Sequence, residues 1–458
     1  MNRKTALASV TFAAITAAPE LVPRFRDYRL YDWASAVAVL DFRPRITPSK
    51  PVEDEQLRLQ PDDSRRYGVW PVHDPAREME RFYEALNRTE TGGAGAVTRI
   101  IHYGDSPTTA DMITADARAL LQQRFGNAGH GFSLIAKPWA WYAHRGVEQS
   151  GEGWTIDAAN QSSLRDGLFG LGAVSFTGCE GASAEVRIRD GTHSSVEVSY
   201  LRRKKGGTFS VNTNEERLGE VNTEGDAAEG AFQRLATPAG SRRFVLKVEK
   251  GCVRIFGVSL EKTGPGVIYD SLGVNGAYVS ILARLISELH WAAQLRHYRP
   301  NLIVINYGTN ESVYPPFLDS AFEKELKTVI GRIRAAVPEA SILLMSPMDR
   351  GVRERTGEIG TVPEMPRLVN IEERVATQTG VAFFNTFQAM GGPGTMGRWY
   401  AAEPRLVNAD FIHPTPAGAT FVGNLLYRAL FDGYNRHKLR KVQKRARAEP
   451  APSAKMVR

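Results

Sequence analysis

Two different periodicities of apolar residues divide the chain, and together they restrict its fold. The apolar run AVTRIIHY ends just before Gly104, and a helical stretch follows as far as Gly126. The alternation resumes after residue 265, where the runs LIVINYG, SILLMS and VAFFN are each followed by a stretch with helical periodicity. Strands that alternate with helices form a parallel sheet covered on both faces. These parts therefore predict an α/β domain with three layers, α/β/α.

The middle of the chain, residues 150–262, has a period of two residues instead. Its runs AEVRIRD, SVEVSYL, GTFSVNTN, RRFVLKVEK and CVRIFGVSLEK are separated by turn residues. This pattern is typical of an antiparallel β-sandwich, here inserted between two parts of the α/β domain, residues 95–149 and 263–435. The segment also holds the chain's two cysteines, Cys179 and Cys252. They either pair, in an exported protein, or remain two separate buried thiols.

The N-terminal region has a distinct composition. Residues 1–19 combine a short basic start with a weakly apolar run that is too short to span a bilayer. Small residues close the run before Pro19, so the segment resembles a secretory signal peptide, with an uncleaved cytoplasmic start as the alternative. Residues 20–94 predict an extended leader that ends in a helix, whose apolar face comprises Met79, Phe82, Tyr83 and Leu86.

The C-terminal segment accounts for the charge of the chain. Residues 436–458 carry nine Lys or Arg and one Glu, which equals the formal charge of the whole chain, +8. A basic surface shaped by the fold is therefore not indicated, and no nucleic-acid partner is expected. The segment predicts a disordered basic tail, which can also make peripheral contact with an anionic envelope surface.

Five residues near predicted strand ends or helix starts carry the groups that serine hydrolysis requires. Ser106, in a Gly-Asp-Ser triplet, stands at a strand-to-helix turn, where its hydroxyl can be exposed. Gly276 in GVNGA offers a backbone N–H before a helix, and Asn310 in GTNE offers an amide at a strand end. In DFIHPTPAG, Asp410 lies three residues before His413, so the carboxylate can orient the imidazole. Each motif alone is usually a turn or a cap, but their combination in this order indicates a nucleophile turn.

Two further features carry less weight. The stretch PWAWYAHRG offers Trp139, Trp141 and Tyr142, which either stack on sugar rings or, as we favour, pack the junction between the domain and its insert. No group of Cys and His residues has metal-ligand spacing, and no glycine-rich loop has phosphate-binding form. The sequence therefore predicts no metal and no cofactor.

The four motifs resemble those of the SGNH (GDSL) hydrolases, whose marker residues are Ser, Gly, Asn and His. The resemblance implies that Ser106 is the nucleophile, that His413 is the base and that Asp410 orients it. It also implies an oxyanion hole formed by the backbone N–H groups of Ser106 and Gly276 and by the Asn310 amide. The match covers roughly residues 95–140 and 265–430.

Two positions depart from the family pattern, and a narrower resemblance goes further. Ala277 and Glu311 stand where many members carry Asp, which leaves the triad intact. The stretches GVNGA and SPMDR and the β-insert look most like those of bacterial peptidoglycan O-acetylesterases, whose insert is akin to carbohydrate-binding modules.

This resemblance implies a periplasmic or secreted serine esterase that removes acetyl or other short acyl groups from a cell-wall polysaccharide, such as peptidoglycan, or another polysaccharide. The alternatives are a lipid or thioester acylhydrolase, a polysaccharide O-acetyltransferase on the same triad, and a non-catalytic glycan-binding protein.

Overall fold

The structure of the protein is a computed structural model, which describes residues 69–448 apart from residues 94, 163 and 215. The predicted signal peptide at residues 1–19 and most of the predicted leader lie outside these residues. Within the described part, no helix combines the length and the apolar character that crossing a membrane requires.

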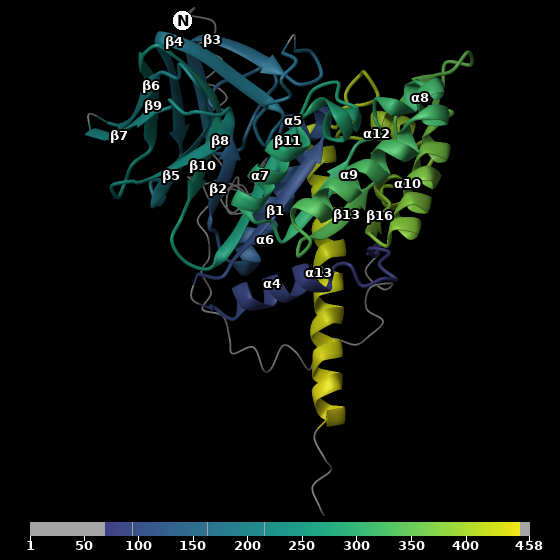
Figure 1. Cartoon of the computed structure of the whole chain (residues 1–458). Coiled ribbons are helices and arrows are strands. Elements are labelled where there is room, and N and C mark those ends of the chain that lie inside the picture. The colour runs from purple at the N-terminus through teal and green to yellow at the C-terminus, as the bar shows by residue number, and fades with distance from the viewer. Residues whose placement is uncertain (1–68, 94, 163, 215, 449–458) are drawn as a thin grey trace, which may run out of the picture. The chain divides into compact units, whose positions relative to one another are not determined.

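A parallel sheet of five strands forms the centre of the α/β part (Figure 1). Neighbouring strands are parallel throughout. In their order across the sheet, the strands are β11 (Gly266–Gly273), β1 (Val97–Gly104), β12 (Leu302–Asn306), β13 (Ser341–Met345) and β16 (Ala382–Phe384). Gly104 lies opposite both Gly273 and Asn306, so the three strands end at the same level of the sheet. In such sheets, active-site residues gather at the carboxyl ends of the strands.

Helices cover both faces of this sheet (Figure 1). Successive strand residues point to opposite faces: Ile100 packs in one apolar cluster, and Ile101 packs in another. The first cluster includes residues of α4 (Glu80–Glu90), α6 (Met112–Phe125) and α13 (Pro416–Ala448). The second includes residues of α7 (Glu288–Tyr298), α9 (Phe322–Ala336) and α10 (Met365–Thr379). The predicted three-layer α/β/α arrangement is confirmed.

Short elements complete this part. Helical turns are α5 (Ser106–Thr109), η3 (Glu311–Val313), α8 (Pro315–Ser320), α11 (Thr386–Ala389) and α12 (Thr395–Ala401), and β14 (Gly351–Arg353) pairs with β15 (Ile359–Thr361). The apolar stretch YVSILARLISELHWAAQL, residues 278–295, does not form one continuous helix. A π-helical turn, η2 (Ile281–Leu285), ends at Ile286, whose backbone is extended, and α7 begins two residues later. The break places the N–H of Ser287 2.9 Å from the carbonyl oxygen of Gly167, which accepts its hydrogen bond.

An antiparallel sheet of nine strands lies in sequence between β1 and β11. Seven strands follow the order β7-β6-β9-β4-β10-β5-β8, while β2 pairs with β10 and β3 with β4. The strands are β2 (Gly129–Ser133), β3 (Val147–Ala158), β4 (Val174–Ile188), β5 (Ser195–Arg202), β6 (Thr208–Thr213), β7 (Glu216–Asn222), β8 (Glu229–Ala236), β9 (Arg243–Lys250) and β10 (Cys252–Glu261). The antiparallel pairing is confirmed, and its strands begin at Gly129, before the expected start at residue 150.

Strand β4 divides this sheet into two branches. Its first half, up to Cys179, pairs with β10, whereas its second half, from Ser183, pairs with β9. Apolar side chains from both branches, among them Val198 and Leu246, belong to one buried cluster. A common core of two branches is compatible with the sandwich, which stays a prediction.

A buried arginine joins the two sheets. Arg99 on β1 contacts Asp270 on β11 at 2.7 Å and Glu261 on β10 at 2.8 Å, and it donates to the Ser259 hydroxyl at 3.1 Å. Asp270 also accepts a hydrogen bond of 2.7 Å from the backbone N–H of Phe132 on β2. Removing one partner of a buried ion pair leaves an uncompensated charge. The antiparallel sheet is therefore tied to the parallel sheet by a charged network as well as by the chain.

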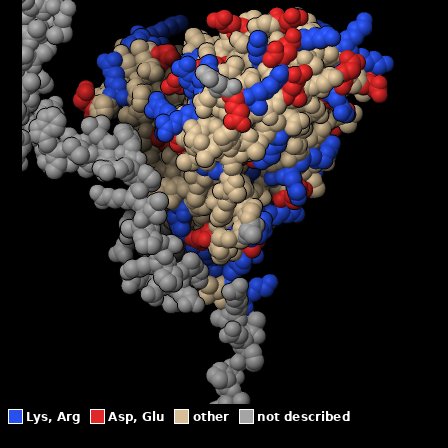
Figure 2. All heavy atoms as spheres, turned by 90° about the vertical axis from the view of Figure 1, so that its left-hand side faces the viewer, with Lys and Arg blue, Asp and Glu red and all other residues tan. Residues whose placement is uncertain are grey.

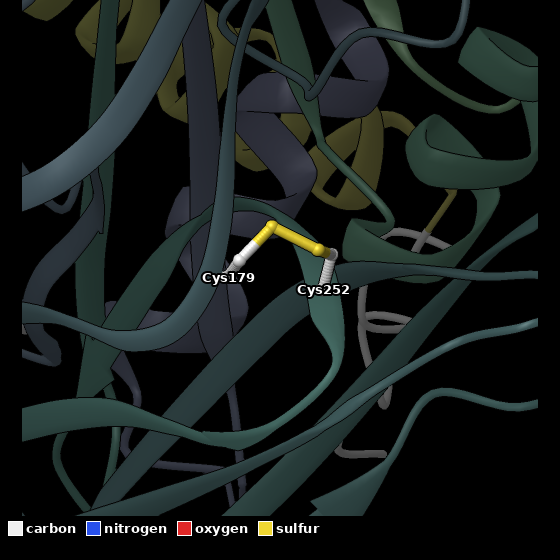
Figure 3. Close-up of a disulfide and its surroundings, with 2 residues drawn as sticks. All are labelled: Cys179 and Cys252. Atoms are coloured by element: carbon white, nitrogen blue, oxygen red, sulfur yellow. A yellow bond between two sulfur atoms is a disulfide. The ribbon is translucent and has the colours of Figure 1, made fainter.

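A disulfide between Cys179 and Cys252 joins β4 to β10 where the branches diverge (Figure 3). The structure thus favours the first of the two alternatives for these cysteines. The bond closes a loop whose ends are 73 residues apart in sequence. A cross-link over a loop of this length restricts the unfolded chain.

We expect the double variant Cys179→Ser/Cys252→Ser to lose about 2–4 kcal/mol of unfolding free energy. Urea unfolding of the oxidised wild type and of the variant measures this difference. A reduced wild-type sample serves as the control and should unfold at the same urea concentration as the variant. Equal midpoints for oxidised wild type and variant would show that the bond contributes nothing.

The basic segment at residues 436–448 continues helix α13, so the prediction of a disordered tail from Arg436 was wrong for these residues. Basic side chains here contact glutamates of α4: Glu80 contacts His437 and Arg440, Glu84 contacts His437 and Lys441, and Glu90 contacts Lys438. The glutamate side chains of α4 thus take the place of solvent as partners of these basic side chains. On the face shown in Figure 2, Lys and Arg side chains likewise lie among Asp and Glu side chains.

Candidate active site

Ser106 begins the short helix α5 directly after strand β1. The turn between them requires Gly104, because a Cβ atom there would lie 2.3 Å from the Thr108 hydroxyl oxygen and 3.0 Å from the Asn306 carbonyl oxygen. Pro107 in the first turn of α5 suits a helix start, where its missing N–H is not needed. The serine hydroxyl is thereby held at the carboxyl end of the sheet.

The structure brings the three predicted triad residues together, although Ser106 and His413 lie 307 residues apart in sequence. His413 Nε2 is 2.8 Å from Ser106 Oγ, and His413 Nδ1 is 2.7 Å from Asp410 Oδ2. In this arrangement, Nδ1 donates to the carboxylate, and Nε2 can accept the serine proton. The geometry is that of an activated nucleophile.

Asp410 is held by the loop that carries it. Its Oδ1 accepts hydrogen bonds of 3.0 Å from the backbone N–H groups of Ile412 and His413. Partial burial would raise the pKa of Asp410, but the hydrogen bonds from the His413 ring and from these two N–H groups outweigh it and lower the pKa. Asp410 is therefore ionised at neutral pH and can stabilise a positively charged His413.

The predicted oxyanion-hole residues follow strands on either side of β1. Gly276 comes after β11, and Asn310 comes after β12. Gly276 has a φ of +65°, which few other residues adopt, and its turn leaves it exposed. The Asn310 side-chain amide donates one hydrogen bond of 2.9 Å to the Ala277 carbonyl oxygen, which joins the two loops. Its second N–H has no partner among the described residues and can donate to a substrate oxygen.

A buried glutamate connects the same two loops. Glu311, fully buried, accepts hydrogen bonds from the backbone N–H of Val279 at 2.8 Å and from that of Gly308 at 3.0 Å. The sequence marked Glu311 only as a departure from the family pattern. Its position directly after Asn310 was the sequence feature that could have indicated that Glu311 positions the Asn310 amide.

Two further buried carboxyl groups lie near Glu311. Burial raises the pKa of Asp105 to about 6, while hydrogen bonds from Thr309 oppose the shift. Glu372 on α10 is fully buried, and neither of its carboxyl oxygens has a hydrogen-bond partner in the described residues. Burial, together with the nearby Glu311 and Asp105, raises its pKa well above the usual value. Three acids thus lie below the catalytic loops in a region that disfavours negative charge.

We expect Glu311 to make stability depend on pH. Burial raises its pKa to about 8, so the folded chain binds this proton more tightly than the unfolded chain, in which glutamate titrates near 4.5. Its contribution to stability is complete below pH 4.5 and is lost as the pH rises to about 8. Between pH 5.5 and 7.5, Glu311→Gln should remove a slope of up to about 1.4 kcal/mol per pH unit.

Urea unfolding at several pH values measures this difference in slope. The exposed Glu358 supplies the control, because Glu358→Gln should leave the pH dependence of wild type unchanged. If Glu311→Gln and wild type show the same pH dependence, Glu311 is ionised in the folded chain throughout this range.

The sequence also missed Arg350, which follows β13 in the stretch SPMDR. Its guanidinium donates to the Thr309 carbonyl oxygen at 2.7 Å, next to Asn310. Electrostatic interactions with Asp105 and Asp410 place its charge near the catalytic residues. An arginine here adds positive potential where an oxyanion develops.

The sequence of residues 247–421 matches the GDSL-like lipase/acylhydrolase family. The matched range holds Gly276, Asn310, Asp410 and His413 within one continuous segment. Ser106 precedes it because the antiparallel sheet separates the nucleophile from the rest, but the structure returns it to His413. This segment is that of an SGNH hydrolase. The triad indicates a serine esterase.

Comparison with solved structures agrees with this fold. A structure titled "Peptidoglycan O-acetylesterase in action, 5 min" has a TM-score of 0.66 and 22% sequence identity, and covers 82% of this chain and 99% of its own. A family two carbohydrate esterase from Clostridium thermocellum in complex with cellohexaose has a TM-score of 0.25 and 14% identity, over 60% and 97% of the two chains. That score is too low to support an argument. No curated protein sequence matches the chain.

We propose that these residues perform ester hydrolysis in two steps, which their geometry allows. Ser106 Oγ attacks the ester carbonyl while His413 Nε2 takes the serine proton, and the Asn310 amide with the N–H groups of Ser106 and Gly276 can stabilise the oxyanion. His413 then donates the proton to the departing alcohol oxygen, which leaves an acyl-enzyme. Water, deprotonated by His413, attacks this ester and releases the acid and free Ser106.

Proposed function

We propose that the hydrolase removes acetyl groups from an O-acetylated polysaccharide of the cell envelope, with peptidoglycan as the first candidate. The observation that carries this proposal is the openness of the triad. The side chains of His413 and Asp410 are 37% and 45% exposed. An open triad can act on an ester at the surface of a large polymer, whereas a long acyl chain needs an apolar cavity to leave water.

The fold likeness supports the same substrate class. The O-acetylesterase structure covers 82% of the chain. The residues outside the segment 150–262 make up less than this share of the chain, so the matched part includes residues of that segment. The likeness therefore includes part of the antiparallel sheet as well as the parallel one. A shared fold does not by itself give a shared substrate, so the polymer must be tested directly.

An exposed tryptophan lies in a loop that contacts the nucleophile helix. Trp141 is 56% exposed, and two residues later the N–H of Ala143 donates to the carbonyl oxygen of Thr109, the last residue of α5. Tyr142, by contrast, is buried and contacts Leu134. The expected packing role therefore fits Tyr142, and Trp141 is the residue of this stretch that is free to stack on a sugar ring.

A pocket of about 310 Å³ adjoins this loop. Its walls come from the residues after α5, from residues 143–148 and from the first turn of α13, which follows the His413 loop. Arg145, Glu148 and Arg189 line it and supply charged groups suited to a polar polymer. We place the sugars next to the acetylated residue over this pocket.

The proposed location is the periplasm or the exterior of the cell. The disulfide between Cys179 and Cys252 supports it, because such bonds persist in oxidising compartments. Peripheral contact of the basic end of α13 with an anionic envelope surface remains part of the proposal, carried by the surplus of Lys and Arg after residue 436.

The decisive experiment compares substrates. We expect acetate release from O-acetylated peptidoglycan and turnover of p-nitrophenyl acetate, with little turnover of the octanoate ester. Acetyl-xylan separates peptidoglycan from other acetylated polysaccharides. Faster cleavage of the octanoate ester would instead establish a lipid-type acylhydrolase, and transfer of acetyl to an added oligosaccharide in preference to water would establish a transferase.

We expect Trp141→Ala to lower kcat/KM on the acetylated polymer by about 2–10-fold, the loss of one stacking contact, with no change on p-nitrophenyl acetate. Trp70, which is 43% exposed and lies before the α/β part in sequence, supplies the control. Trp70→Ala should behave as wild type on both substrates. If Trp141→Ala is also indistinguishable from wild type on the polymer, the sugars do not contact this loop.

A further inference from the structure

A group of histidines and one aspartate lies in the antiparallel sheet, away from the triad in sequence. His130 is on β2, and Asp190 and His193 are in the turn between β4 and β5. His130 Nδ1 is 3.2 Å from His193 Nε2, and His193 Nδ1 is 3.2 Å from Asp190 Oδ1. One possible ligand atom from each of the three residues lies within 4.8 Å of the other two.

The group is partly enclosed, because His193 is buried whereas His130 and Asp190 are half-buried. His193 is 2% exposed. Its Nδ1 and the Oδ1 of Asp190 are buried, and neither has a partner with hydrogen-bond geometry in the described residues. Lys262 contacts Asp190 through the other carboxylate oxygen, Oδ2, at 2.8 Å, while Oδ1 faces His193 Nδ1 at 3.2 Å. Buried polar atoms without partners are rare in native proteins and require an explanation.

A third histidine, His144, packs against His130. The His144 ring stacks on that of His130, with centroids 5.7 Å apart, and its Nε2 donates to the His130 carbonyl oxygen at 3.1 Å. The stacked ring of His144 helps to fix the position of the His130 ring.

We propose that His130, His193 and Asp190 bind a divalent transition-metal ion, of which zinc fits best. Two imidazoles and one carboxylate are typical zinc ligands. Zinc–nitrogen bonds of 2.0–2.1 Å in a tetrahedral arrangement place two ligand atoms about 3.3 Å apart. Each of the two distances of 3.2 Å is close to this value, but they involve different nitrogens of His193, of which the ion uses one. The ion uses one nitrogen of each ring and Asp190 Oδ1, and water completes the tetrahedron.

The position of the site gives it a structural effect. An ion held there joins β2, which follows the α/β helix α6, to the turn between β4 and β5. The ion also fixes the position of His130, on whose ring the His144 ring stacks. The loop that carries His144 lines the pocket next to the catalytic segments. The site takes no part in the ester hydrolysis derived above, and its failure would leave the proposed function unchanged.

The test is zinc titration of the full chain, stripped of metal, by isothermal titration calorimetry. We expect one ion to bind per chain, and we expect His130→Ala and His193→Ala each to weaken binding at least about tenfold. The exposed His73 is the control, and His73→Ala should bind as wild type. Binding by His193→Ala that equals wild type, or no binding by wild type, would overturn the site.

Two measurements do not depend on the folding of those variants. Cobalt added to the wild-type chain should give the visible absorption of tetrahedral cobalt, and its absence overturns the proposal. Lys262→Met should bind zinc more tightly, because it removes a positive charge next to Asp190. If His413→Ala abolished zinc binding, the ion would bind at the catalytic residues, and the site at His130, Asp190 and His193 would be wrong.

Discussion

Ser106→Ala is expected to lower kcat on p-nitrophenyl acetate by about 10⁴–10⁶-fold. The hydroxyl lies 2.8 Å from His413 Nε2 and is the nucleophile of both chemical steps, so no other group replaces it. His413→Ala should be equally inactive, because triad members act as a unit. Asp410→Asn should keep more activity, since the orienting acid is the least critical member.

The measurement is steady-state hydrolysis together with labelling by a fluorophosphonate probe. Ser106→Ala should not be labelled, whereas wild type should take one label per chain. His73→Ala, outside the site, controls for the general effect of replacing a histidine. Wild-type kcat in a folded Ser106→Ala protein would show that the nucleophile is another residue, and absence of turnover and labelling in wild type would favour a non-catalytic glycan-binding protein.

The second large effect concerns the oxyanion. Asn310→Ala is expected to lower kcat by about 10²–10³-fold with little change in KM, because the amide acts when charge develops on the carbonyl oxygen. Part of the loss comes from the missing hydrogen bond to the Ala277 carbonyl, which holds the two loops together.

A matched variant controls for the removal of an amide. Asn424→Ala on α13 removes an amide that donates to the Thr420 carbonyl oxygen of its own helix, and it should retain wild-type kinetics. Crystallographic or spectroscopic evidence of an undisturbed 276–277 loop in Asn310→Ala would assign the loss to the oxyanion. A higher KM at unchanged kcat would mean that Asn310 binds the substrate rather than the transition state.

Most of the catalytic site was predictable because each residue lies next to a strand with a strong local signal. Ser106 follows β1, Gly276 follows β11 and Asn310 follows β12, and the carboxyl ends of adjacent parallel strands meet at one edge. The triad needs only short-range order in each motif, since the sheet brings the motifs together. Local patterns therefore sufficed for the triad and for the expected oxyanion residues, but not for Glu311 or Arg350.

Features that depend on distant partners were not predictable. The helical basic segment after Arg436 is accompanied by pairing with the glutamates of α4, more than 300 residues earlier. The Arg99 network and the division of β4 likewise depend on which strands meet. The His130 and His193 side chains meet from positions 63 residues apart, so no spacing rule indicated a metal site.

The order of the strands also determines when activity can arise during folding. Val97 of β1 pairs with Gly266, and Ile100 pairs with Leu302, so β1 has no neighbour in its sheet until the antiparallel strands have been synthesised. Those strands pair over shorter separations and can form first. Their pairing of β2 with β10 brings the ends of the long loop together and reduces the entropy lost when β1 and β11 meet. His413 is the last triad residue to be synthesised, so we expect esterase activity only after β1 has joined the parallel sheet and the His413 loop has reached Ser106.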